Sequence, residues 1–199
     1  MLGRMLIHAC ALSVLAILPL RAQQLQSSRT IGIRIVTTLG TIDAELDSAR
    51  APLTVTNFLR YVDGHYYDAG AFYRAVTNAN QPTDSVRIEV IQGGMVGNGF
   101  SRPYPAIPLE RTSVTGLHHG NGTLSMARGG PGTATDSFFI TIGDQPALDF
   151  GGHRNPDGQG FAAFGRVTSG GDVVRAIQQQ PVDGQSLVKP VTIIRIERR

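Results

Sequence analysis

The sequence predicts a mainly β domain, organised as a closed antiparallel barrel with a helix covering each end. Apolar residues alternate with polar ones near the start of the chain, as in strands that bury one face. Residues 66–167 consist of short apolar runs separated by Gly, Pro, Asn and Asp, which is typical of barrels and sandwiches. Helical spacing is confined to two short segments, one on each side of this stretch. We expect closure because a closed sheet exposes no strand edges.

The first element is a β-hairpin within residues 31–46. Its apolar residues follow the period of two that places every second side chain on the buried face. A glycine between the two runs marks the turn. The alternating residues are Ile31, Ile33, Ile35, Ile42, Ala44 and Leu46, and the glycine is Gly40.

Two helices and a closing strand complete the predicted elements. Pro52 stands where the first turn of a helix tolerates proline, and Gly64 ends the apolar spacing that follows. Asp172 is expected to cap the second, shorter helix. Residues 191–196 are expected to form the last strand. The apolar residues of the first helix are Val55, Phe58, Leu59 and Val62, and those of the second are Val173, Ala176 and Ile177.

Residues 1–22 are predicted to form a signal peptide, residues 23–30 a polar linker and residues 31–199 a single domain. Arg4 precedes an apolar run that is shorter than the roughly 20 residues a membrane-spanning helix needs. Ala22 offers a small residue at the cleavage point. The prediction is therefore a periplasmic or secreted protein with no stable membrane insertion after cleavage. The alternative is a leader retained as an anchor.

The composition is that of one ordinary globular domain and argues against nucleic acid as a partner. The chain has 199 residues, of which 41% are hydrophobic and 17% charged. Removing the leader removes Arg4 and Arg21 and no acid, so the formal net charge falls from +3 to +1. Lys189 is the only lysine, and basic residues do not cluster with aromatics as they do in a nucleic-acid groove. The single cysteine, Cys10, lies in the leader, so we expect no disulfide.

Several short segments carry residues that point to a chemistry. Residues 72–74 place an arginine beside aromatic residues in an expected strand. Residues 90–94 end a strand with a glutamine and two glycines, which permit close approach of the backbone. Residues 122–131 lead through two threonines to an aspartate, a serine and an apolar strand at residues 136–140.

Taken in this order, these segments resemble the cyclophilin family. The signature runs of that family are similar to Phe-His-Arg, Ile-Gln-Gly-Gly, Leu-Ser-Met-Ala and Ser-Gln-Phe-Phe-Ile. Residues 148–149 and 161–167 resemble its Leu-Asp and Val-Phe-Gly-Lys-Val stretch. The resemblance covers roughly residues 31–197 and implies an eight-stranded antiparallel barrel capped by two α-helices. It also implies a peptidyl-prolyl cis/trans isomerase, here of a bacterial and exported type.

The resemblance implies the residues of the active site as well. Arg74 matches the catalytic arginine of the family, and Gln92 matches the glutamine beside it. Apolar side chains would line a pocket for proline, and a strip of backbone would bind the residues that precede it. The pocket would have Phe139 as its floor and Leu148, Val90 and Phe161 as its walls, Ser137 would assist, and the strip would be Ala127, Arg128 and Gly129.

Some residues depart from the family pattern. Most of the replacements keep the pocket apolar, whereas a glutamate falls where a pocket phenylalanine is expected. Residues 78–87 are an insertion between the arginine and the glutamine, which is polar and should form a loop. The replacements are Tyr73 for histidine, Ser137 for glutamine, Ala147 for tryptophan, Phe161 for histidine and Glu89 for phenylalanine.

Isomerisation would need neither a cofactor nor a metal, because no bond is made or broken. Rotation about a peptide bond meets a barrier of roughly 18–20 kcal/mol, and X-Pro bonds interconvert slowly enough to limit folding. In the twisted state the prolyl nitrogen becomes pyramidal and can accept a hydrogen bond, which Arg74 would donate. The expected partners are proline-containing segments of unfolded or folding exported proteins, and the protein is expected to be a monomer.

The main alternative is a non-catalytic module that binds proline-containing or unfolded segments in the same groove, and Ser137, Glu89 and the missing tryptophan favour it. A secreted structural barrel without a ligand is another. A metal site is not expected, because His118 and His119 would point to opposite faces of an extended chain. In addition, no cysteine or acidic cluster completes a site.

Overall fold

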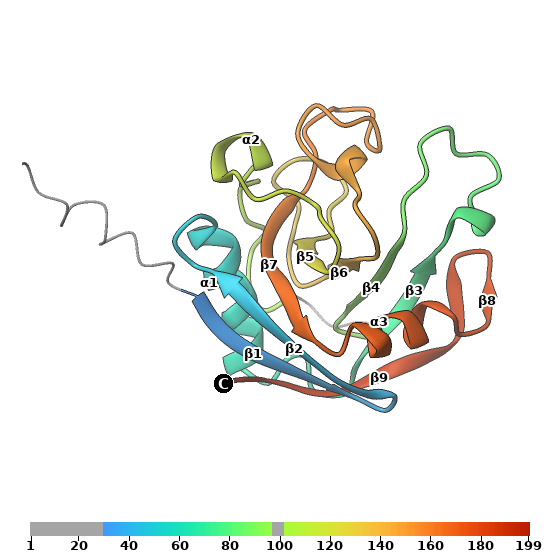
Figure 1. Cartoon of the computed structure of the whole chain (residues 1–199). Coiled ribbons are helices and arrows are strands. Elements are labelled where there is room, and N and C mark those ends of the chain that lie inside the picture. Colours follow the sequence, from blue (N-terminus) through green and yellow to red (C-terminus); the bar gives the residue numbers. More distant parts are fainter. Residues whose placement is uncertain (1–29, 97–101) are drawn as a thin grey trace, which may run out of the picture.

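The structure is a computed structural model that describes residues 30–96 and 102–199 (Figure 1). The predicted signal peptide and nearly all of the predicted linker lie outside the described residues. Thr30, which was assigned to the linker, is the first residue of a strand. In the described part of the chain, no helix is long and apolar enough to cross a membrane.

A closed antiparallel barrel forms the body of the domain. Its strands are hydrogen-bonded in the order β1-β2-β7-β5-β6-β4-β3-β9, and β1 also pairs with β9, which closes the sheet. The prediction of a closed eight-stranded barrel is confirmed, and a two-residue strand, β8, pairs with β9 in addition. The strands are β1 (Thr30–Thr37), β2 (Gly40–Asp47), β3 (Gly70–Val76), β4 (Val90–Gly94), β5 (Thr123–Met126), β6 (Phe138–Thr141), β7 (Ala162–Ser169), β8 (Val182–Asp183) and β9 (Ser186–Arg198).

The first two strands form the predicted hairpin. Thr37 pairs with Gly40 across a two-residue turn, and the register continues to the pair formed by Thr30 and Asp47. Gly40 has a φ of +135°, a conformation that side-chain-bearing residues rarely adopt. The alternating apolar residues point into the barrel, because Ile33, Ile35, Ile42 and Leu46 are fully buried.

The first helix also matches its prediction. α1 spans Pro52–Asp63 with proline in its first turn, and the chain leaves the helix at Gly64. It contacts β2, β7 and β9. A four-residue helix, α2 (Thr112–Thr115), and two short 3₁₀ helices, η1 (Asn78–Asn80) and η2 (Pro146–Leu148), lie in the connections.

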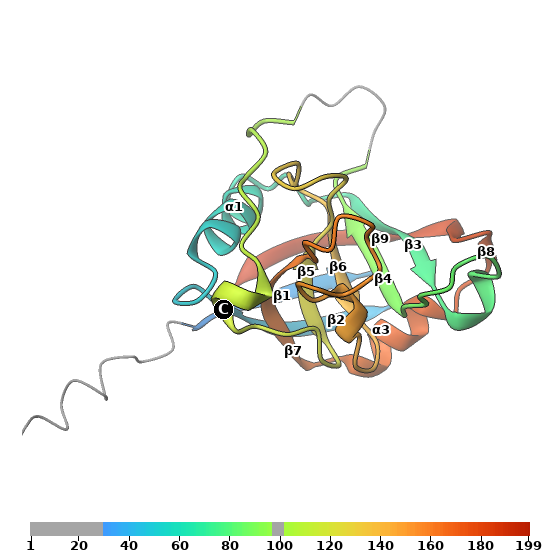
Figure 2. The same cartoon turned by 90° about the horizontal axis from the view of Figure 1, so that it is seen from above.

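The second long helix begins differently from its prediction. α3 spans Gly171–Gln178 and its N-cap is Gly170, with a φ of +82°, whereas Asp172 lies inside the first turn. Since β7 is paired with β2 up to Ser169, the chain has one residue in which to turn, and glycine permits the left-handed conformation that this requires. The prediction that Asp172 caps the helix is therefore wrong. Viewed from above, α1 and α3 lie on opposite sides of the barrel (Figure 2).

The barrel interior holds a cluster of aromatic rings. Phe58 of α1 lies with its ring centroid 5.1 Å from those of Tyr67 and Phe164, and 5.3 Å from that of Phe138. All four side chains are fully buried. Burial of each such ring contributes on the order of 2 kcal/mol, so this cluster is a main source of the stability of the barrel.

A second, smaller apolar cluster lies on the outer face of the sheet. Side chains alternate along β4 and β6, so Ile91 and Phe138 join the barrel core while Val90 and Phe139 face outward. This alternation places an apolar surface on the outside of the barrel, beside Arg74 of β3 and Gln92 of β4. The cluster consists of Val76, Ile88, Val90, Phe139 and Leu148, with Ala127, Ala147 and Phe161 packed against it.

Candidate active site

A β-bulge in β3 turns Arg74 to the outer face. The register of β3 against both β4 and β9 shifts between Phe72 and Arg74. Phe72 and Ala75 are both buried in the barrel core, which strict alternation would not allow for residues three apart. The shift places Tyr73 and Arg74 together outside the barrel, next to the apolar cluster. A bulge of this kind is a common way to re-aim a side chain at a site.

Two glutamine side chains hold the guanidinium of Arg74. Its Nη1 donates to Oε1 of Gln92 over 2.7 Å, from the residue that faces it on β4. Its Nε and Nη2 donate to Oε1 of Gln185 over 3.0 Å and 2.5 Å. Burial lowers the pKa of Arg74 from its ordinary value, and the positive charge of Arg154 lowers it further. The side chain is therefore a partly desolvated cation in a fixed orientation.

A tyrosine and a serine orient Gln92 in turn. Nε2 of Gln92 donates to Oη of Tyr73 over 3.2 Å, and Tyr73 donates to Oγ of Ser137 over 3.1 Å. The amide oxygen of Gln92 is thereby directed to Arg74 and its nitrogen to Tyr73. The two residues that replace the histidine and glutamine of the family pattern thus form a hydrogen-bonded chain that ends at the arginine.

The two glycines after Gln92 permit the close approach expected of them. A Cβ at Gly93 would lie 2.8 Å from the carbonyl oxygen of Ala71, and one at Gly94 would lie 3.0 Å from a carboxylate oxygen of Asp136. Asp136 is fully buried and accepts a hydrogen bond from the backbone N–H of Met95 over 3.0 Å. These contacts fix the backbone at the end of β4, from Gly93 to Met95.

A cavity of about 250 Å³ opens beside Arg74 and Gln92. Its apolar side includes Phe139 and Phe161, whose rings meet edge to face with centroids 5.3 Å apart. The structure therefore brings most of the predicted site residues around one cavity. Those that line it are Arg74, Gln92, Val90, Phe139, Leu148, Phe161, Ala127 and Arg128.

Two predicted residues stand outside the lining of this cavity. Ser137 accepts a hydrogen bond from Tyr73 through its Oγ, and its carbonyl oxygen accepts one from the backbone N–H of Ala127 over 2.9 Å. Gly129 is exposed, and its N–H donates to Oγ1 of Thr133 over 3.0 Å. Both residues border the site and shape its backbone strip.

Glu89 does not occupy the pocket position assigned to it. Ile88 lines the cavity instead and belongs to the outer apolar cluster. Residues 88, 90 and 92 share one face of the extended chain, so Glu89 faces away from them. Its backbone carbonyl accepts a hydrogen bond from Ile142 over 2.9 Å. The glutamate therefore does not place a charge in the apolar pocket.

From the sequence, only the backbone of Arg128 is expected to take part in the site. Its side chain also has a structural role. Its Nη1 and Nη2 bind the carboxylate of Asp157 over 2.7 Å and 2.9 Å, and its Nε donates to the carbonyl oxygen of Gly160 over 2.8 Å. The guanidinium lies 5.0 Å from the ring centroid of Phe161. The hydrogen bonds from Arg128 lower the pKa of Asp157 to about 2. Arg128 thus fixes the pocket wall at Phe161.

The adjacent histidines converge on one carboxylate. Nδ1 of His118 and Nδ1 of His119 lie 2.9 Å and 2.6 Å from the two oxygens of Asp149. The prediction of opposite faces is wrong because the backbone is not extended here, since the N–H of Gly120 donates to the carbonyl of His118. Burial raises the pKa of Asp149, but the hydrogen bonds from His119 and His118 outweigh it, so the net shift is downward.

The buried His119 supports the pocket floor from behind. Its ring stacks on Phe139 with centroids 5.9 Å apart, and its Nε2 lies 2.9 Å from Oγ of Ser125. Within residues 30–96 and 102–199, no group of three or more His, Cys, Asp or Glu side chains could hold a metal ion. We assign these histidines to packing and hydrogen bonding.

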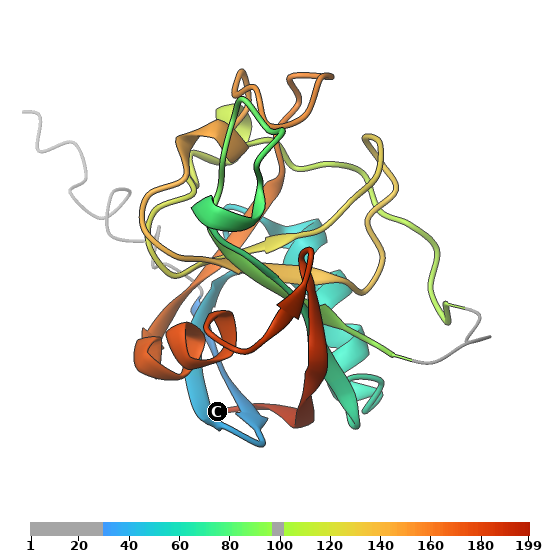
Figure 3. The ribbon, with the colours of Figure 1, turned by 90° about the vertical axis from the view of Figure 1, so that its right-hand side faces the viewer.

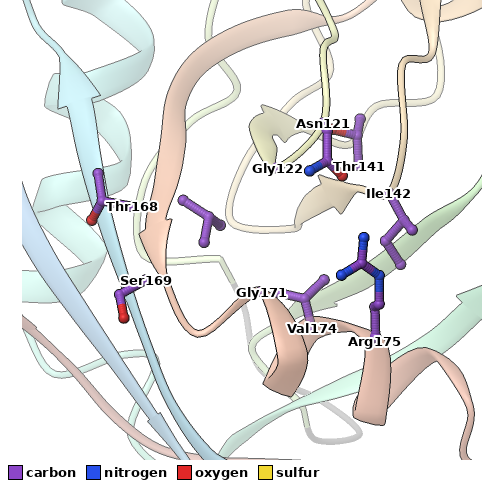
Figure 4. Close-up of a pocket in the computed structure, with 10 residues that line it drawn as sticks. Asn121, Gly122, Thr141, Ile142, Thr168, Ser169, Gly171, Val174 and Arg175 are labelled. Carbon is purple, nitrogen blue, oxygen red and sulfur yellow. The ribbon is translucent and has the colours of Figure 1, made fainter.

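A separate cavity of about 180 Å³ lies beside α3 and contains none of the predicted site residues (Figure 4). Val174 and Arg175 border it from α3, and Thr141 and Ile142 border it from the end of β6. It has no aromatic side chain in its lining. The predicted site residues therefore gather at the cavity beside Arg74 and not at this one.

Sequence reasoning missed several residues of the site. Gln185 binds the arginine from 111 positions further along the chain. Arg154 lines the cavity and donates to the carboxylate of Asp84 over 3.0 Å and to the carbonyl oxygen of Val86 over 2.7 Å. Asp183 and Gly184 signal the hairpin whose turn contains Gln185, but no local pattern indicates where the hairpin lies. The other lining residues that were missed are Ile88 and Asn155.

Comparison with known proteins agrees with the geometry. The family model described as cyclophilin type peptidyl-prolyl cis-trans isomerase/CLD matches residues 32–198. The chain is 37% identical over 147 residues to the peptidyl-prolyl cis-trans isomerase cyp18 of Streptomyces antibioticus. This alignment covers 73% of this chain and 82% of that protein. It is 31% identical over 171 residues to a peptidyl-prolyl cis-trans isomerase of Acinetobacter baylyi, covering 83% and 84% of the two chains.

A solved structure shows the same fold. The crystal structure of a cyclophilin type peptidyl-prolyl cis-trans isomerase of Cryptosporidium parvum superposes with a TM-score of 0.69 at 24% identity, covering 85% of this chain and 98% of that one. The barrel, the cavity beside Arg74 and the match over nearly all the described residues lead to one conclusion. The chain belongs to the cyclophilin-type peptidyl-prolyl cis-trans isomerase family.

Proposed function

We propose that this isomerase accelerates X-Pro rotation in folding exported proteins, and that Arg74 does so by donating a hydrogen bond to the prolyl nitrogen in the twisted transition state. The observation that carries the proposal is the guanidinium of Arg74, held at the rim of an apolar cavity by Gln92 and Gln185.

The planar and the twisted amide differ in whether the prolyl nitrogen can accept a hydrogen bond. In the planar form the nitrogen lone pair is delocalised, which is the origin of the barrier of roughly 18–20 kcal/mol. In the twisted form the lone pair is localised and becomes a hydrogen-bond acceptor. A donor placed at that nitrogen is therefore worth more in the transition state than in either ground state, which is the condition for catalysis.

Arg74 retains donors for this role. A guanidinium carries five N–H groups, and the bonds to Gln92 and Gln185 engage three of them in the described structure. The remaining two belong to the terminal nitrogens. Because the three bonds fix the plane of the group, the free donors are preorganised and need not reorient during rotation.

The apolar side of the cavity suits the proline ring. Phe139 would form the floor and Leu148, Val90 and Phe161 the walls, which would hold the ring while the preceding carbonyl swings. In the backbone strip, the amides of Ala127 and Gly129 already donate to Ser137 and Thr133. We therefore assign the N–H of Arg128 as the strip's donor for a carbonyl that precedes proline.

The exported setting rests on the sequence of residues 1–22. A basic residue, a short apolar run and a small residue before a polar stretch are the features of a cleaved signal peptide. The proposal is a monomer in the periplasm or outside the cell that acts on proline-containing segments. Fractionation of the producing cell, followed by N-terminal sequencing, tests it: the proposal predicts a protein outside the cytoplasm that begins near Gln23, and a cytoplasmic protein that begins at Met1 would contradict it.

The cis-to-trans relaxation of an X-Pro-Phe peptide tests the catalytic part. The protein should accelerate relaxation in proportion to its concentration. A well-folded protein that binds the peptide but leaves the relaxation rate unchanged would contradict the proposal and would favour the non-catalytic peptide-binding module instead.

A further inference from the structure

The side chain of Gln185 accepts hydrogen bonds from Arg74, and its backbone is hydrogen-bonded to the strand that carries Arg74. The single oxygen Oε1 accepts from Nε over 3.0 Å and from Nη2 over 2.5 Å, so one edge of the guanidinium is closed. The carbonyl of Gln185 accepts from the N–H of Ala75 over 3.0 Å, and the next residue, Ser186, pairs with Arg74 in the sheet. The guanidinium cannot rotate about its last side-chain bond without breaking both hydrogen bonds to Gln185.

The inserted segment, residues 78–87, holds Gln185 in this place. Nδ2 of Asn80 donates to the carbonyl oxygen of Gly184 over 3.1 Å and to that of Ala75 over 2.9 Å. The carbonyl oxygen of Asn80 accepts from Nε2 of Gln185 over 3.4 Å. Asn80 therefore ties the β8–β9 hairpin to β3. Figure 3 shows the green 3₁₀ turn of the insertion directly beside the red tip of this hairpin.

A buried amide gives the insertion a defined shape. Gln81 is 1% exposed, and its Nε2 donates to the carbonyl oxygens of Thr77 and Ile88, over 2.7 Å in each case. Its Oε1 accepts from the N–H of Ile88 over 3.2 Å. These three bonds join the two ends of the loop where it leaves β3 and approaches β4. The predicted polar loop therefore has a defined, hydrogen-bonded structure that supports the hairpin.

Strand β8 and the turn that carries Gln185 add no buried apolar side chain to the barrel core. Both residues of β8, Val182 and Asp183, are exposed, and Gln185 itself is half-buried. The contact between Gln185 and Arg74 is consequently a link between the insertion and the active site rather than part of the main apolar core. Its loss should change the orientation of one side chain more than the stability of the domain.

We propose that Gln185 is a positioning residue for Arg74 and that the inserted segment keeps Gln185 in place through Asn80. The inference rests on the role of Arg74 in the proposed function. Gln185 reaches the reaction through the arginine and does not line the cavity, so its removal should lower kcat and leave KM nearly unchanged.

A matched pair of substitutions separates the hydrogen bond from the shape of the side chain. Gln185→Met keeps the length and removes the acceptor oxygen, and it should lower kcat roughly tenfold, as expected for a hydrogen bond to a charged group. Gln185→Glu keeps an oxygen that can accept from the same two N–H groups and should retain most of the parent kcat. KM should stay within about twofold in both. Gln179→Met, at an exposed glutamine after α3, is the control and should behave as the parent.

Combination with Arg74→Ala distinguishes positioning from a general structural effect. If Gln185 acts through the arginine, Gln185→Met should cause no further loss when Arg74 is absent. An equal loss in both backgrounds, or parent-like activity of Gln185→Met beside an impaired Arg74→Ala variant, would overturn the inference and leave the role of the arginine standing. If Arg74→Ala itself keeps the parent rate, the proposed mechanism fails together with the inference.

A spectroscopic measurement checks the positioning without kinetics. The Nε–H proton of Arg74 should exchange slowly with water in the parent and in Gln185→Glu, and fast in Gln185→Met. Asn80→Ala should shift this exchange in the same direction as Gln185→Met and by a smaller factor. Equally slow exchange in the parent and in Gln185→Met would show that Gln185 does not hold the guanidinium.

Discussion

The hydroxyl of Tyr73 offers a sharp test of how Gln92 is oriented. It accepts from Nε2 of Gln92 and donates to Ser137, over 3.2 Å and 3.1 Å. Tyr73→Phe removes both bonds and little volume. Each such bond contributes about 0.5–1.5 kcal/mol net, and only the bond to Gln92 bears on the orientation of Arg74. The expected loss of transition-state stabilisation is therefore about 1 kcal/mol, which corresponds to roughly a fivefold lower kcat/KM.

Ser137→Ala is the matched comparison. It removes the acceptor of Tyr73 but leaves the bond between Tyr73 and Gln92, so kcat/KM should fall less than about twofold. The assay is catalysed relaxation of an X-Pro-Phe peptide, with thermal unfolding of each variant as the folding control. Parent-like activity of Tyr73→Phe, or a loss in Ser137→Ala as large as that in Tyr73→Phe, would refute this reasoning.

Three further predictions concern a buried carboxylate, the ion pair of an exposed aspartate and a left-handed glycine. Asp136→Ala removes a fully buried carboxylate that accepts the N–H of Met95 and pairs with an arginine, so urea titration should show a loss of about 1–3 kcal/mol in the free energy of unfolding; a loss under about 0.5 kcal/mol would contradict the assignment. The carboxyl of Asp157, with a pKa of about 2, should titrate near that value by NMR and return toward 3.8 in Arg128→Met. Because the folded pKa lies below the ordinary one, the stabilisation from this pair is complete above about pH 4 and is lost as the pH falls through about 2. An unchanged titration would exclude Arg128 as the cause. Gly170→Ala places a Cβ against the carbonyl oxygen of Thr41 at a φ of +82°, so it should destabilise the protein by at least about 1–2 kcal/mol in the same urea assay, and an unchanged midpoint would contradict this.

The sequence predicted the parts of the fold that depend on local periodicity. The alternation in residues 31–46 and the apolar spacing from Val55 to Val62 gave the first hairpin and α1, because one buried face imposes one repeat. The start of α3 was misassigned because the left-handed glycine at position 170 depends on where β7 ends. That end is set by pairing with β2 and not by a local signal.

The sequence predicted those site residues that lie in short motifs matching the family pattern. It could not predict residues that the fold brings to the site from distant segments. Arg74, Gln92 and Phe139 were placed by short motifs, and the structure brings them around one cavity. Gln185 could not be placed because its position depends on barrel closure and on contacts with the insertion. Glu89 was assigned to the pocket position that Ile88 occupies. In an extended chain, a shift of one residue moves a side chain to the opposite face.

In the proposed mechanism, Arg74 stabilises the twisted amide and not the bound peptide. Exchange spectroscopy of an X-Pro-Phe peptide with the parent and with Arg74→Ala gives the catalysed interconversion rate, and titration in the same spectra gives the Kd. Arg74→Ala should lower the catalysed rate roughly a hundredfold or more and leave the Kd within about threefold of the parent. A retained rate, or a rate that falls only in proportion to weaker binding, would contradict it.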